Sequence, residues 1–385
     1  MKIALVENFG SDFVGARLRF AVFLKEKGIE VTAIIPQDGH REFVENRGIG
    51  VIEVGANIRG NGIKNKFEYA KQLKQILKKE SFDIVHFYRL QPNIIGTFIA
   101  GIYTKSKIVN HVTGLGVAFT NKSSKNRLFQ FVIKFLYKFN NVCFRPYTIY
   151  QNKHDSFDLG IQKRAICIEG SAVNESKFYK ELALKKQDEI LSLKSELKIP
   201  IQGAKVFLFV SRLLKEKGIL QLIDGFIKAQ NETDEPIYLV LVGWSDSENP
   251  SSVKPKELEA LIKNYNNILF LGKRSDVDLL VTLSDVCILP TYYREGTPRF
   301  LLEAMALGKA IITTDMPGCD HLIENNENGQ LIEPKSVDEI KNSILKIIDR
   351  DLVKLGIKSN ELYHNKFSEK RVYSSILNLY ESILK

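Results

Sequence analysis

The sequence predicts an α/β protein made of two open parallel sheets in tandem, each packed between helices. At 385 residues the chain is too long for one ordinary domain and suits two of about 150–200 residues. Short β-branched runs alternate with longer amphipathic stretches, an order typical of parallel sheets covered by helices on both faces. This alternation restarts after a polar, lysine-rich segment at residues 177–198.

The expected strands fall into two sets, one in each half of the chain. The first set is Ile3–Glu7, Val31–Pro36, Val51–Val54, Ile84–Phe87, Ile108–Val112, Thr148–Tyr150 and Ile166–Ile168. The second set is Val206–Val210, Tyr238–Val242, Ile268–Leu271, Val286–Leu289, Ile311–Thr313 and Gln330–Ile332. We divide the chain into an N-terminal domain (1–198), a C-terminal domain (199–366) and a last helix (367–385) expected to pack on the N-terminal domain. In such sheets, ligands bind at the carboxyl ends of the strands.

The composition excludes several classes of protein. With 44% hydrophobic and 26% charged residues, the chain is globular and not disordered. No apolar run approaches the roughly 18 residues that span a bilayer. The first expected strand begins at Ile3, which leaves no room for a signal peptide, so we expect a cytoplasmic protein. The four cysteines lack the spacing of a disulfide framework or a zinc site.

The net charge of +10 is unevenly distributed. Between Asp83 and Asp155 there is no acidic residue, whereas ten lysines and arginines occur there. A one-sided field of this kind suits an anionic partner: nucleic acid, a membrane surface or a phosphorylated substrate. The alternative is a basic solvated face without a partner.

Within this segment, a basic stretch leads into a strongly apolar predicted helix. Basic amphipathic helices lie on anionic membranes, where lysine side chains reach the headgroups. The competing interpretation is a buried helix, because the apolar residues occupy more than one face. The candidate membrane-facing residues are Lys122, Lys125, Arg127, Lys134 and Lys138.

The most informative stretch follows the expected strand Val286–Leu289. It carries Glu295, Gly296 and Thr297 in a loop, and Pro298 suits the first turn of the next helix. Free N–H groups at a helix start bind anions, and a glycine lets a ligand approach the backbone. Glu303 lies about one and a half turns into the same helix, where its carboxylate can accept two hydroxyl hydrogen bonds, as from a ribose.

A second group of candidate binding residues follows the expected strand Val206–Val210. Arg212 and Lys217 lie in the turn between this strand and the next predicted helix. The planar guanidinium and the ammonium group can together hold a diphosphate. The turn opens the same half of the chain that contains Glu295.

These motifs resemble those of a known family. S-R-L-x₂-E-K-G (211–218), L-G-x-R-x-D-V (271–277) and E-G-T-P-R-x-L-L-E-A-M-A-x-G (295–308) are similar to family 4 of the retaining glycosyltransferases. These enzymes have the GT-B fold, two Rossmann-like domains facing each other across a cleft. The run at 311–319, with Asn328-Gly329, resembles a subgroup that extends undecaprenyl-diphosphate-linked saccharides in bacterial O-antigen, lipid-linked oligosaccharide or protein glycosylation pathways.

The resemblance implies roles for the donor-site residues. Arg212 and Lys217 would neutralise the diphosphate of a nucleotide sugar, and Glu303 would hold its ribose. Glu295 would lie near the donor sugar, where it would stabilise an oxocarbenium-like charge or position the sugar. The family needs no metal, and we expect no cofactor beyond the UDP-sugar substrate. Further donor residues implied are Gly15, Arg274, Gly296, Thr297 and Pro298.

Other residues are implied to contact the acceptor or a phosphate: Arg17, Arg19, Thr113 and Gly114. Many family members have histidine at the position of Thr113. His111 lies two residues earlier, on the same face of the expected strand. Either His111 takes the catalytic role, or it is a packed core histidine and the role is absent.

The resemblance therefore implies transfer of a sugar, an N-acetylhexosamine in our interpretation, from UDP to a polyprenyl-diphosphate-linked saccharide. The expected location is the inner face of the cytoplasmic membrane, whose anionic surface would be a partner. We expect no nucleic-acid partner. Two other classes compete. A non-hydrolysing UDP-sugar epimerase shares the two-domain architecture but needs no acceptor. A nucleic-acid-binding protein would explain the basic half, but no recognition motif for nucleic acid is present.

Overall fold

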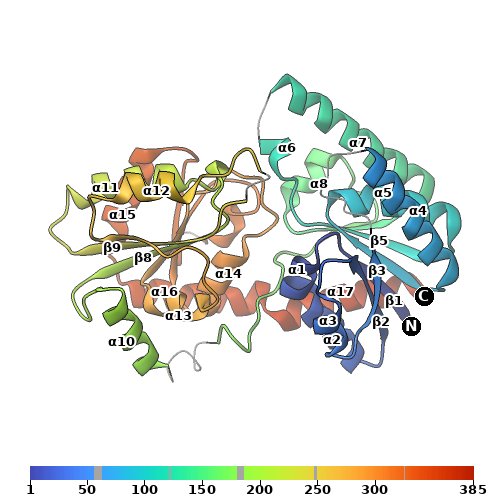
Figure 1. The fold of residues 1–385 in the computed structure, drawn as a ribbon, viewed down its shortest axis with the longest axis horizontal. Coiled ribbons are helices and arrows are strands. Elements are labelled where there is room, and N and C mark those ends of the chain that lie inside the picture. The colour runs from blue at the N-terminus through green and yellow to red at the C-terminus, as the bar shows by residue number, and fades with distance from the viewer. Residues whose placement is uncertain (56–62, 121–122, 180–185, 247–248, 325) are drawn as a thin grey trace. The chain divides into compact units, whose positions relative to one another are not determined.

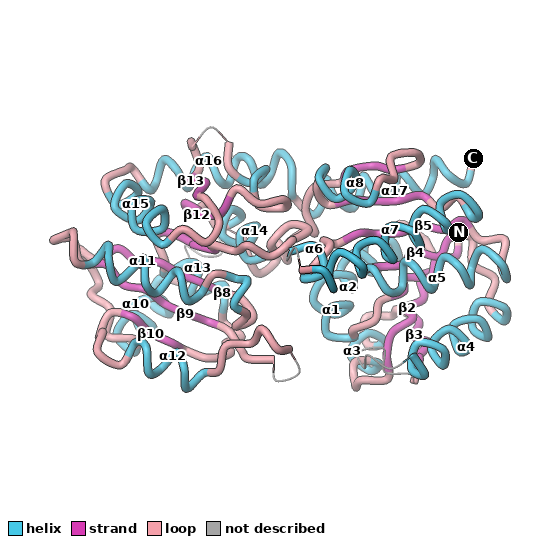
Figure 2. The backbone as a smooth tube through the Cα atoms, turned by 90° about the horizontal axis from the view of Figure 1, so that it is seen from above, coloured by secondary structure: helices cyan, strands magenta, loops and turns pink. Residues whose placement is uncertain are grey.

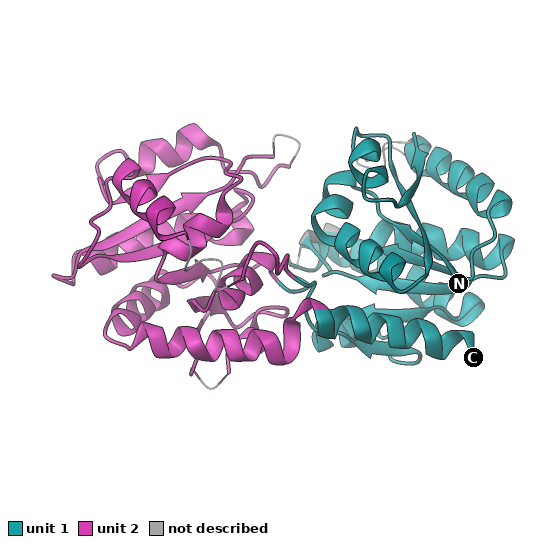
Figure 3. Cartoon of the chain, turned by 90° about the horizontal axis from the view of Figure 1, so that it is seen from below, with its two compact units in different colours: residues 1–172, 295–297, 370–385 teal, residues 173–294, 298–369 magenta. Residues whose placement is uncertain are grey.

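The computed structural model describes residues 1–55, 63–120, 123–179, 186–246, 249–324 and 326–385 (Figure 1). They form two compact units, shown in teal and magenta in Figure 3. Unit 1 comprises Met1–Ala172, Glu295–Thr297 and Lys370–Lys385. Unit 2 comprises Val173–Arg294 and Pro298–Glu369. Each unit contains its own parallel sheet and hydrophobic core.

The sheet of unit 1 has strand order β3-β2-β1-β4-β5-β6-β7, with every neighbouring pair parallel. Burial on both faces explains the largely apolar sequences of its central strands. The chain order reverses between β1 and β4, which makes their carboxyl ends a ligand-binding position for this class of sheet. The strands are β1 (Lys2–Val6), β2 (Glu30–Pro36), β3 (Gly50–Val54), β4 (Ile84–Tyr88), β5 (Lys107–Val112), β6 (Tyr147–Tyr150) and β7 (Ala165–Cys167).

Helices cover both faces of this sheet (Figure 2). Residues of α2 and α17 share one hydrophobic core with β1 and β2, and residues of α4 and α5 share another with β1 and β4. Tyr373 and Tyr380 of α17 lie against the ring of Phe20 in α2, so the last helix belongs to unit 1. The helices are α1 (Gly10–Asp12), a π-helical turn (Phe13–Arg17), α2 (Leu18–Glu26), α3 (Arg41–Glu45), α4 (Ile63–Lys79), α5 (Leu90–Tyr103), α6 (Val117–Thr120), α7 (Ser124–Phe144), α8 (Lys153–Leu159) and α17 (Glu369–Leu384).

The sheet of unit 2 has the order β10-β9-β8-β11-β12-β13 and is also parallel. Its strands are β8 (Lys205–Val210), β9 (Ile237–Val242), β10 (Ile268–Phe270), β11 (Val286–Leu289), β12 (Ala310–Thr314) and β13 (Gly329–Ile332). Its helices are α10 (Gln187–Glu196), α11 (Ile219–Gln230), α12 (Pro255–Ile262), α13 (Val277–Leu283), α14 (Arg299–Ala306), α15 (Val337–Ile348) and α16 (Leu352–Leu362). Single turns occupy Lys215–Lys217, Asp320–Leu322 and Tyr363–Phe367. The two sheets confirm the predicted fold class, and each expected strand is present.

The division between the units differs from the boundary drawn at residue 198. Val173, Phe178 and Leu193 are buried in the core of unit 2, so residues from 173 onwards belong to that unit. The polar composition of this segment conceals the one-sided helix α10. Asp188 and Glu189 in its first turn complement the helix dipole, while Leu193 faces the core.

Candidate functional site

The predicted donor residues of unit 2 follow the carboxyl ends of its strands. Arg212 and Lys217 follow β8, Arg274 follows β10, and Glu303 lies in α14 after β11. Because the strands are parallel, these ends lie along one edge of the sheet. A Cβ atom on Gly218 would lie only 2.1 Å from the carbonyl oxygen of Pro290. The turn that carries Lys217 is therefore packed directly against the end of β11.

Glu216 holds this turn in place, although sequence analysis assigned it no role. Its carbonyl oxygen accepts hydrogen bonds from the N–H of Tyr292 (2.8 Å) and the hydroxyl of Thr291 (3.1 Å). Its carboxylate accepts one from the Ser251 hydroxyl (2.7 Å). Glu216 is buried. The sequence feature that could have pointed to Glu216 was its position next to Lys217 in the E-K-G triplet.

The three predicted cations of this edge have different surroundings. The Arg212 guanidinium is half exposed and lies 3.9 Å from the carboxylate of Asp246. The Lys217 ammonium lies 5.2 Å from the ring centroid of Tyr293. Arg274 instead makes two hydrogen bonds to Asp276, of 2.9 and 2.6 Å, which lower the pKa of that carboxyl. Arg274 is therefore oriented by its own loop, whereas Arg212 presents its charge to solvent.

Burial of the ionised carboxyl group of Glu303 lowers the stability of the fold. Burial raises its pKa from 4.5 to about 6, although Arg299, 3.6 Å away, acts in the opposite direction. The Glu303 side chain is only 13% exposed. A buried carboxylate that destabilises the fold points to a functional role, because a neutral residue would serve packing better.

Glu303→Gln should stabilise the protein at alkaline pH. A raised carboxyl pKa means that the folded state binds the proton more tightly, so ionisation of Glu303 costs stability as pH rises through 4.5 to about 6. The full difference, about 2 kcal/mol, is present above the folded-state pKa. Thermal unfolding should therefore show a higher Tm for the variant at about pH 8 and equal Tm values near pH 4. A variant of equal or lower Tm at the higher pH would contradict this account.

In unit 1, the segment Glu295–Thr297 is held by the residues that follow β6. The Asn152 side-chain amide donates to the carbonyl oxygens of Glu295 (3.2 Å) and Gly296 (3.3 Å). The Thr297 hydroxyl donates to the backbone carbonyl of Gln151 (3.3 Å). Sequence reasoning missed both partners. The polar Gln-Asn pair directly after a buried strand was the signal that could have found them.

Gly296 is also packed closely within unit 1. A Cβ atom there would lie 2.2 Å from the side-chain oxygen of Gln151 and 2.6 Å from the backbone carbonyl of Thr113. The backbone at Thr113 cannot move as easily as a flexible side chain. The requirement for glycine at this position therefore has a packing origin, in addition to any approach of a ligand. Gly114, next to Thr113, has φ of 106°.

Arg17 does not have the exposed position expected of a phosphate ligand. It is buried, its Nε lies 3.6 Å from the buried carboxylate of Glu7, and its guanidinium lies 4.3 Å from the ring centroid of Tyr88. Arg89 is also paired with Glu7, at 3.2 Å. The negative charge of buried Glu7 explains why Arg17 turns inwards, since a lone buried carboxylate would be costly. Arg19 is half-buried.

Gly15 is exposed in the π-helical turn Phe13–Arg17, so its backbone is open to solvent.

His111 lies in β5 within a stack of buried rings. Its ring centroid is 5.4 Å from that of His86 and 5.2 Å from that of Tyr88. Burial lowers its pKa well below the ordinary value, with a further contribution from Arg17, so the ring is neutral. Its Nε2 lies 3.5 Å from the side-chain nitrogen of Gln151. Packing of this kind favours the core-histidine interpretation over a cationic catalytic role.

Helix α7 buries one side and exposes another. Ile133 and Tyr137 are buried in a small core with β5 and β6. Large apolar side chains on the outer side are 41–73% exposed: Leu128, Phe129, Phe131, Val132, Phe135, Phe139 and Val142. Arg127 and Lys138 are exposed, and the Lys134 ammonium lies 5.8 Å from the ring centroid of Phe119. Lys122 lies outside the described residues, as does the side chain of Lys125.

The apolar strip of α7 continues onto α5. The rings of Phe135, Phe139 and Phe144 follow one another at centroid distances of 6.5 and 6.4 Å, and Phe98 of α5 lies 5.8 Å from Phe144. Phe98 and Ile102 of α5 are also exposed. We call this surface, formed by the exposed residues of α7 and α5, the apolar strip. Among the described residues, no helix has the length and low polarity needed to cross a bilayer.

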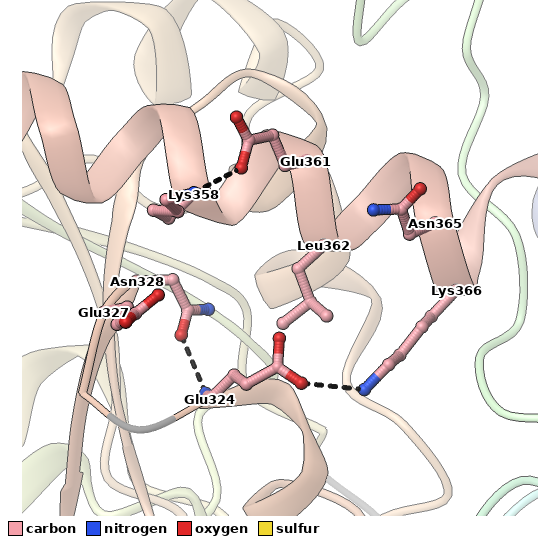
Figure 4. A pocket seen from close by; sticks show the side chains of 8 residues that line it. All are labelled: Glu324, Glu327, Asn328, Lys358, Glu361, Leu362, Asn365 and Lys366. Atoms are coloured by element: carbon pink, nitrogen blue, oxygen red, sulfur yellow. Dashed lines mark hydrogen bonds and ion pairs between the residues drawn. The ribbon is translucent and has the colours of Figure 1, made fainter.

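A separate cavity in unit 2, of about 320 Å³, contains none of the predicted site residues (Figure 4). Both of its lysines are paired with glutamates: Lys358 with Glu361 at 2.8 Å and Lys366 with Glu324 at 3.3 Å. Cations already paired in this way offer little to an anionic ligand. In the parts of the chain that the structure describes, His, Cys, Asp and Glu side chains form no group of three suited to a metal ion.

Comparisons with known proteins agree with the two-unit architecture. The family described as glycosyl transferase 4-like matches residues 2–144, and that described as glycosyl transferases group 1 matches residues 194–366. The solved structure of an Anabaena protein, HepE, in complex with UDP and glucose has a TM-score of 0.79. It is 18% identical in sequence, with 99% of this chain and 100% of that chain covered.

Two curated bacterial enzymes are similar in sequence. One is the N,N'-diacetylbacillosaminyl-diphospho-undecaprenol alpha-1,3-N-acetylgalactosaminyltransferase of Campylobacter jejuni, 26% identical with both chains fully covered. The other is the UDP-Gal:alpha-D-GlcNAc-diphosphoundecaprenol alpha-1,3-galactosyltransferase of Escherichia coli, 27% identical over 80% of this chain and 77% of that enzyme. With both family matches and two Rossmann-like sheets, the chain is a glycosyltransferase of the GT-B fold, glycosyl transferase 4-like over residues 2–144 and group 1 over residues 194–366.

Proposed function

We propose that this glycosyltransferase moves an N-acetylhexosamine from a UDP-sugar to a saccharide carried on a polyprenyl diphosphate, with retention of configuration. One observation carries the choice of substrates: the similarity to the Campylobacter jejuni N-acetylgalactosaminyltransferase extends over 100% of both chains. The name of that enzyme specifies a diphospho-undecaprenol acceptor. The Escherichia coli relative, also named for a diphosphoundecaprenol acceptor, supports the same acceptor class.

The chemistry proposed for unit 2 is electrostatic. Arg212 and Lys217, at the turn after β8, neutralise the diphosphate, which gains negative charge as the bond to the sugar breaks. Glu303 accepts hydrogen bonds from the ribose hydroxyls, an interaction that compensates for the cost of burying its charge. We propose that these groups suffice without a metal or a cofactor, because the cations and helix N-termini supply the positive potential.

Glu295 has a different proposed role. It lies near the donor sugar and stabilises the positive charge that develops on the sugar ring in the transition state. Its segment is anchored by hydrogen bonds that the Asn152 side-chain amide donates to the backbone carbonyls of Glu295 and Gly296. A carboxylate on a backbone fixed in this way needs little reorganisation to stabilise a transition-state charge.

Release of UDP from a panel of UDP-sugars tests the proposed substrates. With a polyprenyl-diphosphate-linked saccharide present, UDP-N-acetylhexosamines should release UDP faster than UDP-hexoses. Without the acceptor, release should fall to the slow rate of hydrolysis. Conversion of the UDP-sugar to its epimer without an acceptor would support the epimerase alternative instead.

We also propose that the apolar strip binds the surface of an anionic membrane from the cytoplasmic side. The exposed apolar residues at 128, 131, 135, 139 and 142 recur at helical spacing, which places them on one side of α7. Aromatic and aliphatic side chains of this kind insert at the boundary between headgroups and acyl chains. An acceptor with a polyprenyl chain is itself held in a bilayer, so this surface brings the enzyme to its substrate.

The charges around the strip favour an anionic lipid surface over other partners. Arg127 and Lys138 are exposed on α7 itself, and Lys74 and Lys78 of α4 lie 4.3 and 4.8 Å from the ring centroid of Tyr103 in α5. The sequence from 84 to 154 contains no acidic residue to oppose them. Nucleic acid is a poor fit, because its phosphate backbone offers nothing to bury a wide apolar surface.

A further inference from the structure

The segment Glu295–Thr297 packs with unit 1, although the residues on either side of it pack with unit 2 (Figure 3). Three hydrogen bonds from or to Gln151 and Asn152 hold it there. Two of these come from the single side-chain amide of Asn152. The backbone of Glu295 is thus fixed by a residue that lies 143 positions earlier in the chain.

Asn152 uses both ends of its side chain. Its Oδ1 accepts a hydrogen bond from the N–H of Asp155 at 2.9 Å and so caps the N-terminus of α8. Its Nδ2 donates to the carbonyls of Glu295 and Gly296. The residue is only 2% exposed, so the carbonyl contacts have little competition from water. The capping hydrogen bond orients the Asn152 side chain, and its amide group then holds the backbone of Glu295 and Gly296.

We infer that Asn152 is a positioning residue for Glu295 in the transfer reaction. Its amide holds the backbone of Glu295, and Gln151 and Thr113 limit the space around Gly296. The inference rests on the proposed role of Glu295. A carboxylate that stabilises a transient charge must be in place before the charge forms, and a displacement of about 1 Å can lower turnover about 100-fold.

Substitutions at Asn152 can separate the cap from the amide. Asn152→Asp keeps an oxygen that caps α8 but has no N–H to donate to the two carbonyls. Asn152→Ser also keeps a capping oxygen, but it has a shorter side chain with a single O–H in place of the NH₂ group. Asn152→Ala removes both interactions. Ser336→Ala is the matched control, because Ser336 caps α15 in unit 2 through the N–H of Glu339 at 3.1 Å.

We expect kcat to fall by at least about 30-fold in all three Asn152 variants, with donor KM and the Kd for UDP changed by less than about three-fold. Tm should fall by a few degrees in every variant, because Asn152→Ala and Ser336→Ala lose a helix cap and all three Asn152 variants lose buried hydrogen bonds to the carbonyls of Glu295 and Gly296. The Ser336→Ala variant should keep the kcat of the parent. The inference is overturned if Asn152→Asp and Asn152→Ser turn over like the parent, or if kcat follows Tm across the series.

The same series distinguishes this inference from the proposed function. A parent that releases no UDP with any lipid-linked acceptor contradicts the proposed substrates. The slow hydrolysis of the UDP-sugar then replaces transfer as the readout, because it passes through the same positive charge on the sugar. A loss of hydrolysis in Asn152→Asp and Asn152→Ser with unchanged UDP affinity still supports the positioning role, and unchanged hydrolysis overturns it.

Discussion

Replacing Glu295 with glutamine should lower kcat by about 100-fold or more and leave the Kd for UDP within about two-fold of that of the parent. Glutamine has the size of glutamate and keeps an oxygen acceptor, so packing of the loop changes little. What it loses is the negative charge. Because that charge is opposed by a positive sugar only in the transition state, its loss affects turnover and not ground-state binding.

Steady-state kinetics with calorimetric titration of UDP measures both quantities. Glu327→Gln, at an exposed glutamate of unit 2, is a control for the loss of one negative charge. It should behave like the parent. Equal losses of kcat and UDP affinity in Glu295→Gln would show that the residue holds the substrate in its ground state and has no special role in the transition state.

Replacing three exposed apolar side chains of the apolar strip by serine should abolish binding to vesicles that contain anionic lipid. Leu128, Phe131 and Phe135 are each more than half exposed, so their replacement by serine leaves the buried side of α7 intact. Together these side chains should contribute at least about 3 kcal/mol to membrane binding, which corresponds to a loss of affinity of more than 100-fold. Salt should release the parent protein from the same vesicles, because the surrounding lysines and arginines contribute an electrostatic part.

Co-sedimentation with vesicles is the measurement, and Ile201, Leu261 and Val353 provide the matched control. These three exposed apolar residues lie in unit 2, whereas α7 belongs to unit 1, and their replacement by serine should leave sedimentation unchanged. The α7 variant should also transfer sugar slowly to a long-chain polyprenyl acceptor but normally to a short soluble analogue. If it sediments with vesicles and uses both acceptors as the parent does, the membrane proposal is wrong.

The sequence predicted the sheets well because parallel strands buried on both faces give short, near-continuous apolar runs. The run Ile84–Phe87, for example, corresponds to β4, which extends one residue further to Tyr88. Helix α10 was missed because it buries mainly Leu193 and leaves most of its polar surface exposed. Its assignment to unit 2 depends on contacts between α10 and residues far along the chain, and a local sequence pattern does not contain that information.

The same limit applies to the site. The motifs located Lys217 and Glu303, since strand-to-helix turns carry recognisable residues. They could not show that Arg17 pairs with Glu7, because no local pattern reports that these two residues, ten positions apart, are buried together. Nor could they show that Asn152 holds Glu295 across 143 positions of the chain. For α7, the pattern left burial and membrane exposure open, and the structure shows that the helix has both a buried and an exposed apolar side.

Analysis of the product formed from a UDP-N-acetylhexosamine and an undecaprenyl-diphosphate-linked saccharide tests the central proposal most directly. Mass spectrometry should show that the lipid-linked saccharide gains one N-acetylhexosamine. Nuclear magnetic resonance of the released glycan should show the new linkage in the anomeric configuration of the donor. An unmodified acceptor with any of these donors, or a product of inverted configuration, would contradict the account.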